Sequence, residues 1–264
     1  KISYGTQGNS EIGNYGSLGL IAATTNWDTN ASWYFVQPAN PELTWEKQKL
    51  FSVGFSGKVF NKLDFELSYW LRNTTDMLMG VPNPYTTGYP TLVQNVGALQ
   101  NSGIDVKLGY DIIRGRDYFF RAGMNFSYTN EKITELFQGR QRYEMSNRLT
   151  AYVVGKPVMY YLPIWAGVDP TDGAPMWYKA GENKDVTTKK ETTKNFDEAE
   201  LTQNSGKRLH APFNGGFNIS AGWKGITLSA DFSVVLGKYL ANNDMFFYAN
   251  LGIVGTQYNQ HKMV

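Results

Sequence analysis

The chain has 264 residues, enough for one large domain or two small ones. Charged residues make up 18% of it, below the roughly 25% that is usual in soluble domains, and aromatic residues reach 15%. The net charge of +2 without a long basic run gives no support for nucleic-acid binding, and the lack of cysteine excludes disulfides and thiolate metal sites. The composition fits an aromatic-girdled sheet or an aromatic-rich β-sandwich.

Alternation of apolar and polar residues predicts three β-hairpins along the chain. Before them, residues 1–40 contain weaker signals for strands at Ser17–Ala23 and Trp33–Val36. The hairpins are expected over residues 47–72, 103–128 and 215–236, with turns at Phe60–Lys62, Arg114–Asp117 and Lys224–Gly225. In each hairpin one face is apolar, while the other carries Ser, Asn, Gly, Asp, Lys and Arg.

Long connections are expected at residues 73–99, 129–214 and 237–264. Short turns and long loops therefore alternate, and antiparallel pairing places all the short turns on one side of the sheet. Strands of about 9–11 residues with this sorting are typical of an outer-membrane barrel. A soluble sandwich rarely sorts its connections so strictly, and a loop of about 80 residues is abnormal inside a compact soluble domain.

Within the longest connection, Ile164–Asp169 and Ala174–Lys179 predict a small hairpin. Between them, Pro170–Gly173 is a good turn sequence. Residues 181–207 are polar and are expected to form a flexible tip.

The two faces of the predicted hairpins have different partners in a barrel. Phe217, Ile219, Leu228 and Phe232 are assigned to lipid, whereas Asn218, Ser220 and Asp231 are assigned to the lumen. Aromatic residues near the strand ends fit an interfacial belt: Phe51, Tyr69, Tyr110, Tyr128 and Trp223. In the alternative interpretation, these rings pack the core of a sandwich.

A catalytic constellation is not visible in the sequence. His210 and His261 are far apart and lie outside any metal-binding spacing. The acidic residues Asp197, Glu198 and Glu200 are typical of a solvated charge run. Asp169–Gly173 lacks the ligand series of a calcium loop and is interpreted as a turn. We therefore expect no catalytic residue, no metal, no cofactor and no enzymatic activity.

Four segments in order resemble SusC-like (SusC/RagA) TonB-dependent transporters. Asn40–Glu46 resembles the "NPxLxWE" element, and Asn95–Asp105 the "N-I/V-G-x-x-x-N-x-G-I/F-D/E" element. Gly155–Trp177 resembles the loop signature "G-x-P…Y…W-A-G-V-D-P-x-T-G-x-P", with Asp172 where the family more often has Thr. Pro212–Gly237 resembles a late hairpin of the family. Each motif is weak alone, but the four in order, over about residues 10–240, are specific.

The resemblance implies a transporter of the Gram-negative outer membrane, in contact with its lipid. Such a protein holds a plug domain inside a barrel of about 22 strands. It imports large nutrients, mostly glycans or peptides, with energy delivered through TonB, and usually works with a SusD-like surface lipoprotein that closes over the lumen.

Residues 1–264 are then expected to form an internal fragment of that barrel without the plug. We expect an all-β, antiparallel up-and-down meander, present as an open curved sheet with long extracellular loops. Two alternatives remain open from the residues: an extracellular β-sandwich that binds glycans, and a passive porin.

Aromatic residues in the long connections are the candidate contacts for substrate or for the lid lipoprotein. Aromatic rings offer large contact area at low entropy cost. Packing of the loops themselves is the alternative role for each of them. The candidates are Tyr85, Tyr89, Tyr160, Tyr161, Trp165, Trp177 and Tyr178.

Overall fold

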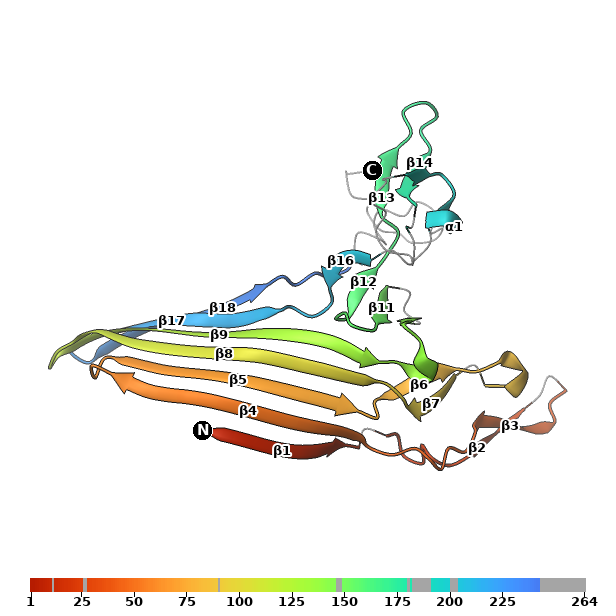
Figure 1. Ribbon diagram of the computed structural model, residues 1–264, viewed down its shortest axis with the longest axis horizontal. Coiled ribbons are helices and arrows are strands. Elements are labelled where there is room, and N and C mark those ends of the chain that lie inside the picture. Colours follow the sequence, from red (N-terminus) through yellow and green to blue (C-terminus); the bar gives the residue numbers. More distant parts are fainter. Residues whose placement is uncertain are drawn as a thin grey trace.

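A single antiparallel sheet of seven strands dominates the molecule (Figure 1). The computed structural model describes residues 1–10, 12–25, 28–89, 91–145, 149–179, 181, 191–199 and 204–242. The strand order is β1-β4-β5-β8-β9-β17-β18. These strands are Ile2–Asn9, Glu46–Val59, Leu63–Thr75, Ala98–Arg114, Tyr118–Glu135, Phe213–Trp223 and Ile226–Leu236. The predicted all-β antiparallel meander is confirmed, and the sheet is open, with β1 and β18 at its edges.

The three predicted hairpins correspond to β4–β5, β8–β9 and β17–β18, but four of their strands are longer than expected. The strands β4, β5, β8 and β9 have 14, 13, 17 and 18 residues, whereas β17 and β18 have 11 each. Backbone pairing continues past the alternating segments, for example where Asn73 pairs with Gln100. The expectation of 9–11 residues was wrong for these four strands because apolar alternation stops before backbone pairing does.

The apolar positions of neighbouring strands lie in register across the whole sheet. One row joins Ile2, Val53, Tyr69, Ile104, Tyr128, Phe213 and Leu236. In the last hairpin Phe217 stacks on Phe232, with ring centroids 4.4 Å apart and the planes 14° apart. Many apolar side chains of this face are exposed over the described residues, Leu228 by 74% and Phe55 by 68%. A sandwich would cover this face with a second sheet, so the structure contradicts that alternative.

Short turns lie at one end of the sheet and long connections at the other, as predicted (Figure 1). The turn between β17 and β18 places Lys224 and Gly225 at φ values of 46° and 88°. Both values are positive, which is the requirement of the two-residue turn that matches strand twist. Phe60 and Asn61, in the three-residue connection between β4 and β5, also have positive φ values, of 51° and 53°.

Three long connections between strands of the main sheet carry small strands of their own. The first, residues 10–45, holds β2 (Leu20–Thr25) and β3 (Ala31–Gln37), close to the two predicted weak strands. The second, residues 76–97, holds β6 (Leu78–Pro82), η1 (Tyr85–Thr87) and β7 (Thr91–Asn95), and the third covers residues 136–212.

The third connection is the largest and forms two small sheets. One contains β10 (Arg142–Glu144), β11 (Thr150–Val153), β12 (Met159–Tyr161) and β16 (Asn204–Arg208), and the other contains β13 (Trp165–Val168), β14 (Pro175–Tyr178) and β15 (Thr192–Thr193). The predicted hairpin around Pro170–Gly173 is therefore confirmed as β13–β14. Two short helical segments, η2 (Phe137–Gly139) and α1 (Phe196–Ala199), complete this connection.

Parts of two predicted segments fall outside the described residues. In the predicted tip at 181–207, residues 182–190 and 200–203 lie outside them, and the rest contains β15, α1 and the start of β16. Residues 243–264 of the last predicted loop also lie outside them, including His261. None of the helices among the described residues is long and apolar enough to cross a bilayer.

The buried core of the described residues lies under the loops instead of on the sheet. One cluster joins Met79, Val81, Ile133, Leu136, Phe137 and Val158, which come from β6, the outer end of β9 and the third connection. A second cluster contains Ala151, Met159 and Tyr161. The second and third connections are thus packed against each other and against the outer end of β9.

Candidate functional site: the polar sheet face and the outer loops

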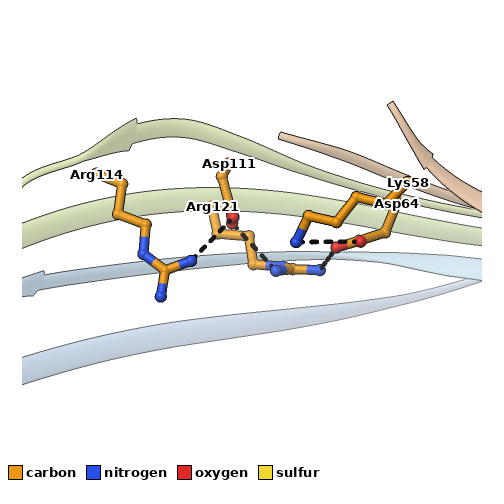
Figure 2. Close-up of polar contacts among 5 residues, drawn as sticks. All are labelled: Lys58, Asp64, Asp111, Arg114 and Arg121. Carbon is orange, nitrogen blue, oxygen red and sulfur yellow. Dashed lines mark hydrogen bonds and ion pairs between the residues drawn. The ribbon is translucent and has the colours of Figure 1, made fainter. Parts of the chain in front are cut away.

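Five charged residues form an ion-pair network on the polar face near the short turns (Figure 2). Arg121 of β9 donates to Asp64 at 2.8 Å and to Asp111 at 3.0 Å. Lys58 lies 3.4 Å from Asp64, and Arg114 lies 3.6 Å from Asp111. The network spans β4, β5, β8 and β9, so it fixes the polar ends of four strands relative to one another.

Further toward the loops, Asp105 joins three strands on the same face. Its carboxylate accepts a hydrogen bond from Ser127 at 2.5 Å and one from Ser68 at 3.4 Å. Polar side chains on this face therefore bond mainly across strands. A hydrated or protein-filled space against this face is compatible with such groups, whereas lipid is not.

The family-like elements at 40–46 and 95–105 hold the bases of two loops together. The side chain of Asn95 donates to the carbonyl oxygens of Thr44 and Asp76 at 2.6 and 2.9 Å, and it accepts from the Thr44 amide at 2.7 Å. Asn40 donates to the Val93 carbonyl at 2.8 Å. The resemblance in these segments thus corresponds to residues that position the outer loops.

Glu46 and Glu131 are anchoring residues that the sequence reasoning missed. Glu46 accepts from the Leu78 amide at 2.9 Å, which ties the start of β4 to β6. Glu131 accepts from the Val158 amide at 2.8 Å and contacts His210 Nδ1 at 2.8 Å, which ties an inner point and the final part of the third connection to β9. The Glu at the end of the "NPxLxWE" element was the available signal for the first of them.

Two of the seven candidate aromatic residues are part of the loop core. Tyr160 and Tyr161 are 8% and 2% exposed. The Tyr160 hydroxyl donates to the Tyr239 carbonyl at 3.3 Å, and the Arg142 guanidinium lies 4.6 Å from the Tyr161 ring centroid. These two side chains present little surface to a ligand, because β12 lies in the middle of its small sheet. Their burial favours the alternative role of loop packing, and their contact with a ligand stays a prediction.

Trp165, Trp177 and Tyr178 come together in the β13–β14 hairpin. The Trp177 ring is half-buried between Trp165, at 5.9 Å, and Phe196, at 5.1 Å, with edge-on geometry in both pairs. Trp165 is 54% exposed, and Tyr178 is half-buried. Trp165 is thus the ring of this cluster with the most free surface.

Tyr85 and Tyr89 lie in the second connection. The backbone of Tyr85 begins η1. Tyr89 is half-buried and lines a cavity of about 510 Å³ with residues of the first connection, among them Val36 and Leu43. The structure does not bring these two tyrosines into the β13–β14 cluster, and contact of any of the remaining candidates with a ligand stays a prediction.

The predicted turn at Asp169–Gly173 is closed by Lys194. The Lys194 ammonium lies 2.6 Å from Asp169 and 2.7 Å from Asp172, and Asp169 also accepts from the amide of Thr171 at 2.8 Å. Hydrogen bonds from Lys194 hold the pKa of both carboxyls below the ordinary value, and the two carboxylates raise the pKa of Lys194. A lysine fills the space between the carboxylates. Within the described residues, no group of three or more His, Cys, Asp or Glu is placed to hold a metal.

Together these features define a class of protein. An open antiparallel meander with one exposed apolar face, one polar face and sorted connections is a section of an outer-membrane barrel wall with its outer loops. The chain belongs to the family described as "TonB dependent receptor-like, beta-barrel", which matches residues 2–233. It is of the SusC/RagA type, a group of TonB-dependent outer-membrane receptors and transporters, as the sequence resemblance indicated.

Solved and curated relatives agree with this assignment. The structure of the RagAB peptide transporter matches with a TM-score of 0.85 and 37% identity, over 95% of this chain and 28% of that one. TonB-dependent receptor P26 of Formosa agariphila is 31% identical over 140 residues, which are 52% of this chain and 14% of the relative. TonB-dependent receptor SusC of Bacteroides thetaiotaomicron is 24% identical over 148 residues, 53% of this chain and 15% of the relative. The chain thus spans a small part of the length of these proteins.

Proposed function

We propose that residues 1–264 form part of the barrel wall and the outer loops of a TonB-dependent importer of a large nutrient. The nutrient is a glycan or a peptide, and it crosses the Gram-negative outer membrane. The observation that carries the proposal is the apolar face, continuous in register over seven strands and exposed over the described residues. Lipid covers such a face in a barrel, while the ion-paired opposite face lines the lumen.

Import works by gated access in this proposal, and no bond is made or broken. The plug and the contact with TonB are assigned to parts of the protein outside residues 1–264. A SusD-like lipoprotein covers the loop end. The similarity to the RagAB peptide transporter supports a transport role, and the packed loops above the lumen supply a surface for substrate or lid.

Uptake by cells tests the proposal. The gene for the full-length protein is deleted and then restored with either the natural form or a form without its TonB-contacting segment. Growth is measured on polysaccharides and on protein digests as the only carbon source. We expect growth on one of the two nutrient classes to require both the gene and the TonB-contacting segment. Growth that needs the gene but not the TonB-contacting segment would indicate a passive pore, and growth on both classes without the gene would contradict an import role.

A further inference from the structure

The outward, apolar face of the sheet becomes polar near the loops, first at Ser102 and Asn130 and then along a whole register row. Toward the turns, the face carries Val53, Tyr69, Ile104 and Tyr128 in one row. Two rows further toward the loops, Thr6, Lys49, Asn73, Gln100 and Lys132 pair one with the next. We call these five residues the basic rim. Gln100 donates to the Asn73 side chain at 2.9 Å, which places both side chains on the same face.

The height of the apolar band places the basic rim at the membrane surface. Along β9 the apolar positions run from Tyr118 to Tyr128, a distance of about 34 Å along the strand. With a strand tilt of about 40°, this distance corresponds to a band roughly 26 Å tall, close to the approximately 25 Å band of outer-membrane barrels. Lys49 lies two positions beyond Phe51, and Lys132 four positions beyond Tyr128. Both therefore lie roughly 5–10 Å past the edge of the band, at the depth of the headgroups.

Among the described residues, two ammonium groups of the basic rim have no carboxylate partner. Lys49 and Lys132 are exposed, and the described part of the chain places no carboxylate within 4 Å of either one. Lys47, the next outward position on β4, differs, because it is paired with Asp76 at 2.9 Å. The remaining members of the rim carry hydroxyl or amide groups, which donate hydrogen bonds to anionic oxygens.

We propose that the basic rim binds the anionic headgroups of outer-leaflet lipids. The proposal rests on the proposed function, since it requires the apolar face to lie in a bilayer. A lysine stem lies along apolar surface while its ammonium reaches the headgroup region, and each such cation near an anionic surface contributes about a fivefold preference. Lys49 and Lys132 are separated by three strand spacings, roughly 14 Å, so they contact the headgroup layer at two separate points.

Spin-labelled lipids test the proposal on the full-length transporter in vesicles. The ratio of association constants for labelled phosphatidylglycerol and labelled phosphatidylcholine measures headgroup selectivity. We expect a ratio well above one for the natural protein and a decrease of tenfold or more for Lys49→Ala/Lys132→Ala. Lys107→Ala is the matched control, because Lys107 is an exposed lysine of the same sheet on the opposite, polar face. High salt should reduce the ratio only where the two lysines are present.

The outcomes separate this proposal from the membrane assignment itself. If no labelled lipid is motionally restricted by the natural protein, the barrel wall is not in the bilayer and the proposed function fails. If lipids are restricted but the double alanine variant keeps the natural ratio, the headgroup proposal fails alone. Loss of a co-purifying acidic protein with an unchanged lipid ratio would assign the basic rim to that protein instead. Lys49→Glu/Lys132→Glu gives a second measurement, in which the ratio should fall below that of the alanine variant.

Discussion

Arg121 Nη2 lies 2.8 Å from Asp64 Oδ2, although the two residues belong to β9 and β5 and β8 runs between them. The guanidinium passes over Gly109 of β8, where an added Cβ would stand 2.7 Å from Arg121 Nη2. The missing side chain at Gly109 thus allows one arginine to cross-link three strands. This network lies at the end of the sheet that carries the short turns. The long loops lie at the other end and do not hold the strands together here.

Replacement of Arg121 should destabilise the barrel wall. In Arg121→Ala, the carboxylate of Asp111, about one-tenth exposed, keeps only Arg114 at 3.6 Å as a charged partner. Loss of this hydrogen-bonded ion pair should cost about 1–3 kcal/mol. Denaturant titration of the full-length protein in detergent measures this loss in the free energy of unfolding. Arg116→Ala, an exposed arginine of the adjacent turn, should be close to neutral, and equal stability of the two variants would contradict the structural role.

Gly109→Ala should act through the same contact. The added methyl group displaces the Arg121 guanidinium and lengthens its bond to Asp64, so the effects of Gly109→Ala and Arg121→Ala should overlap in a double-mutant cycle. We expect the double variant to be little less stable than Arg121→Ala alone. If the two changes in stability were fully additive, Gly109 would have a role other than making room for the Arg121 side chain.

Asn95→Asp should loosen the loop bases more than Asn95→Ala does. The amide group of Asn95 donates to two carbonyl oxygens, and a carboxylate there would face both oxygens without a proton to donate. Limited proteolysis of the full-length protein should show faster cleavage between β6 and β7 in the Asp variant. Gln94→Ala, a change at the neighbouring residue, is the control. Equal resistance of all three variants would contradict the anchoring role.

The β13–β14 turn should be stable between acidic and strongly basic pH. The pKa values of Asp169 and Asp172 are lowered, so their contribution is present above the ordinary Asp pKa of 3.8 and is lost as the pH falls below it. The pKa of Lys194 is raised, so its contribution is present below 10.5 and is lost as the pH rises through the shifted value.

Hydrogen exchange over Trp165–Tyr178, corrected for intrinsic rates, checks this window. The natural protein should lose protection at acidic pH. Lys194→Ala should show reduced protection already at pH 7 and little further change on acidification. An unchanged acid transition in Lys194→Ala would assign the transition to other groups.

Trp165 and Trp177 should respond differently to truncation. Trp165 is 54% exposed, so Trp165→Ala should reduce binding of substrate or lid at least several-fold and leave the loop folded. Trp177 is held between two rings, so Trp177→Ala should expose the hairpin to protease. Pull-down of the lid lipoprotein and limited proteolysis measure the two effects, with Phe60→Asn in a short turn as the control. Normal binding by Trp165→Ala would remove this residue from the candidate contacts.

The sequence by itself determined the three main hairpins, their two faces and the sorting of turns and loops, but not β1 or the full length of four hairpin strands. A side-chain period of two is a local property, and the Phe217–Phe232 pair and the Lys224–Gly225 turn follow from neighbouring residues alone. The four family-like elements were also recognisable from the sequence, because their residues occur in the order of the family. Their function as loop anchors was not readable, since Asn95 bonds to Thr44, which lies 51 residues away.

Tertiary structure alone decided which aromatic and charged residues face one another. Tyr161 and Trp165 are both loop aromatics in the sequence, yet Tyr161 is buried in the sheet β10-β11-β12-β16, whereas Trp165 is 54% exposed on the separate sheet β13-β14-β15. Arg121 meets Asp64, 57 residues away, because the strand order places β8 between them and Gly109 clears the path. Such contacts depend on the register and side-chain direction of several strands relative to one another. The alternation within a single strand carries no information about that register.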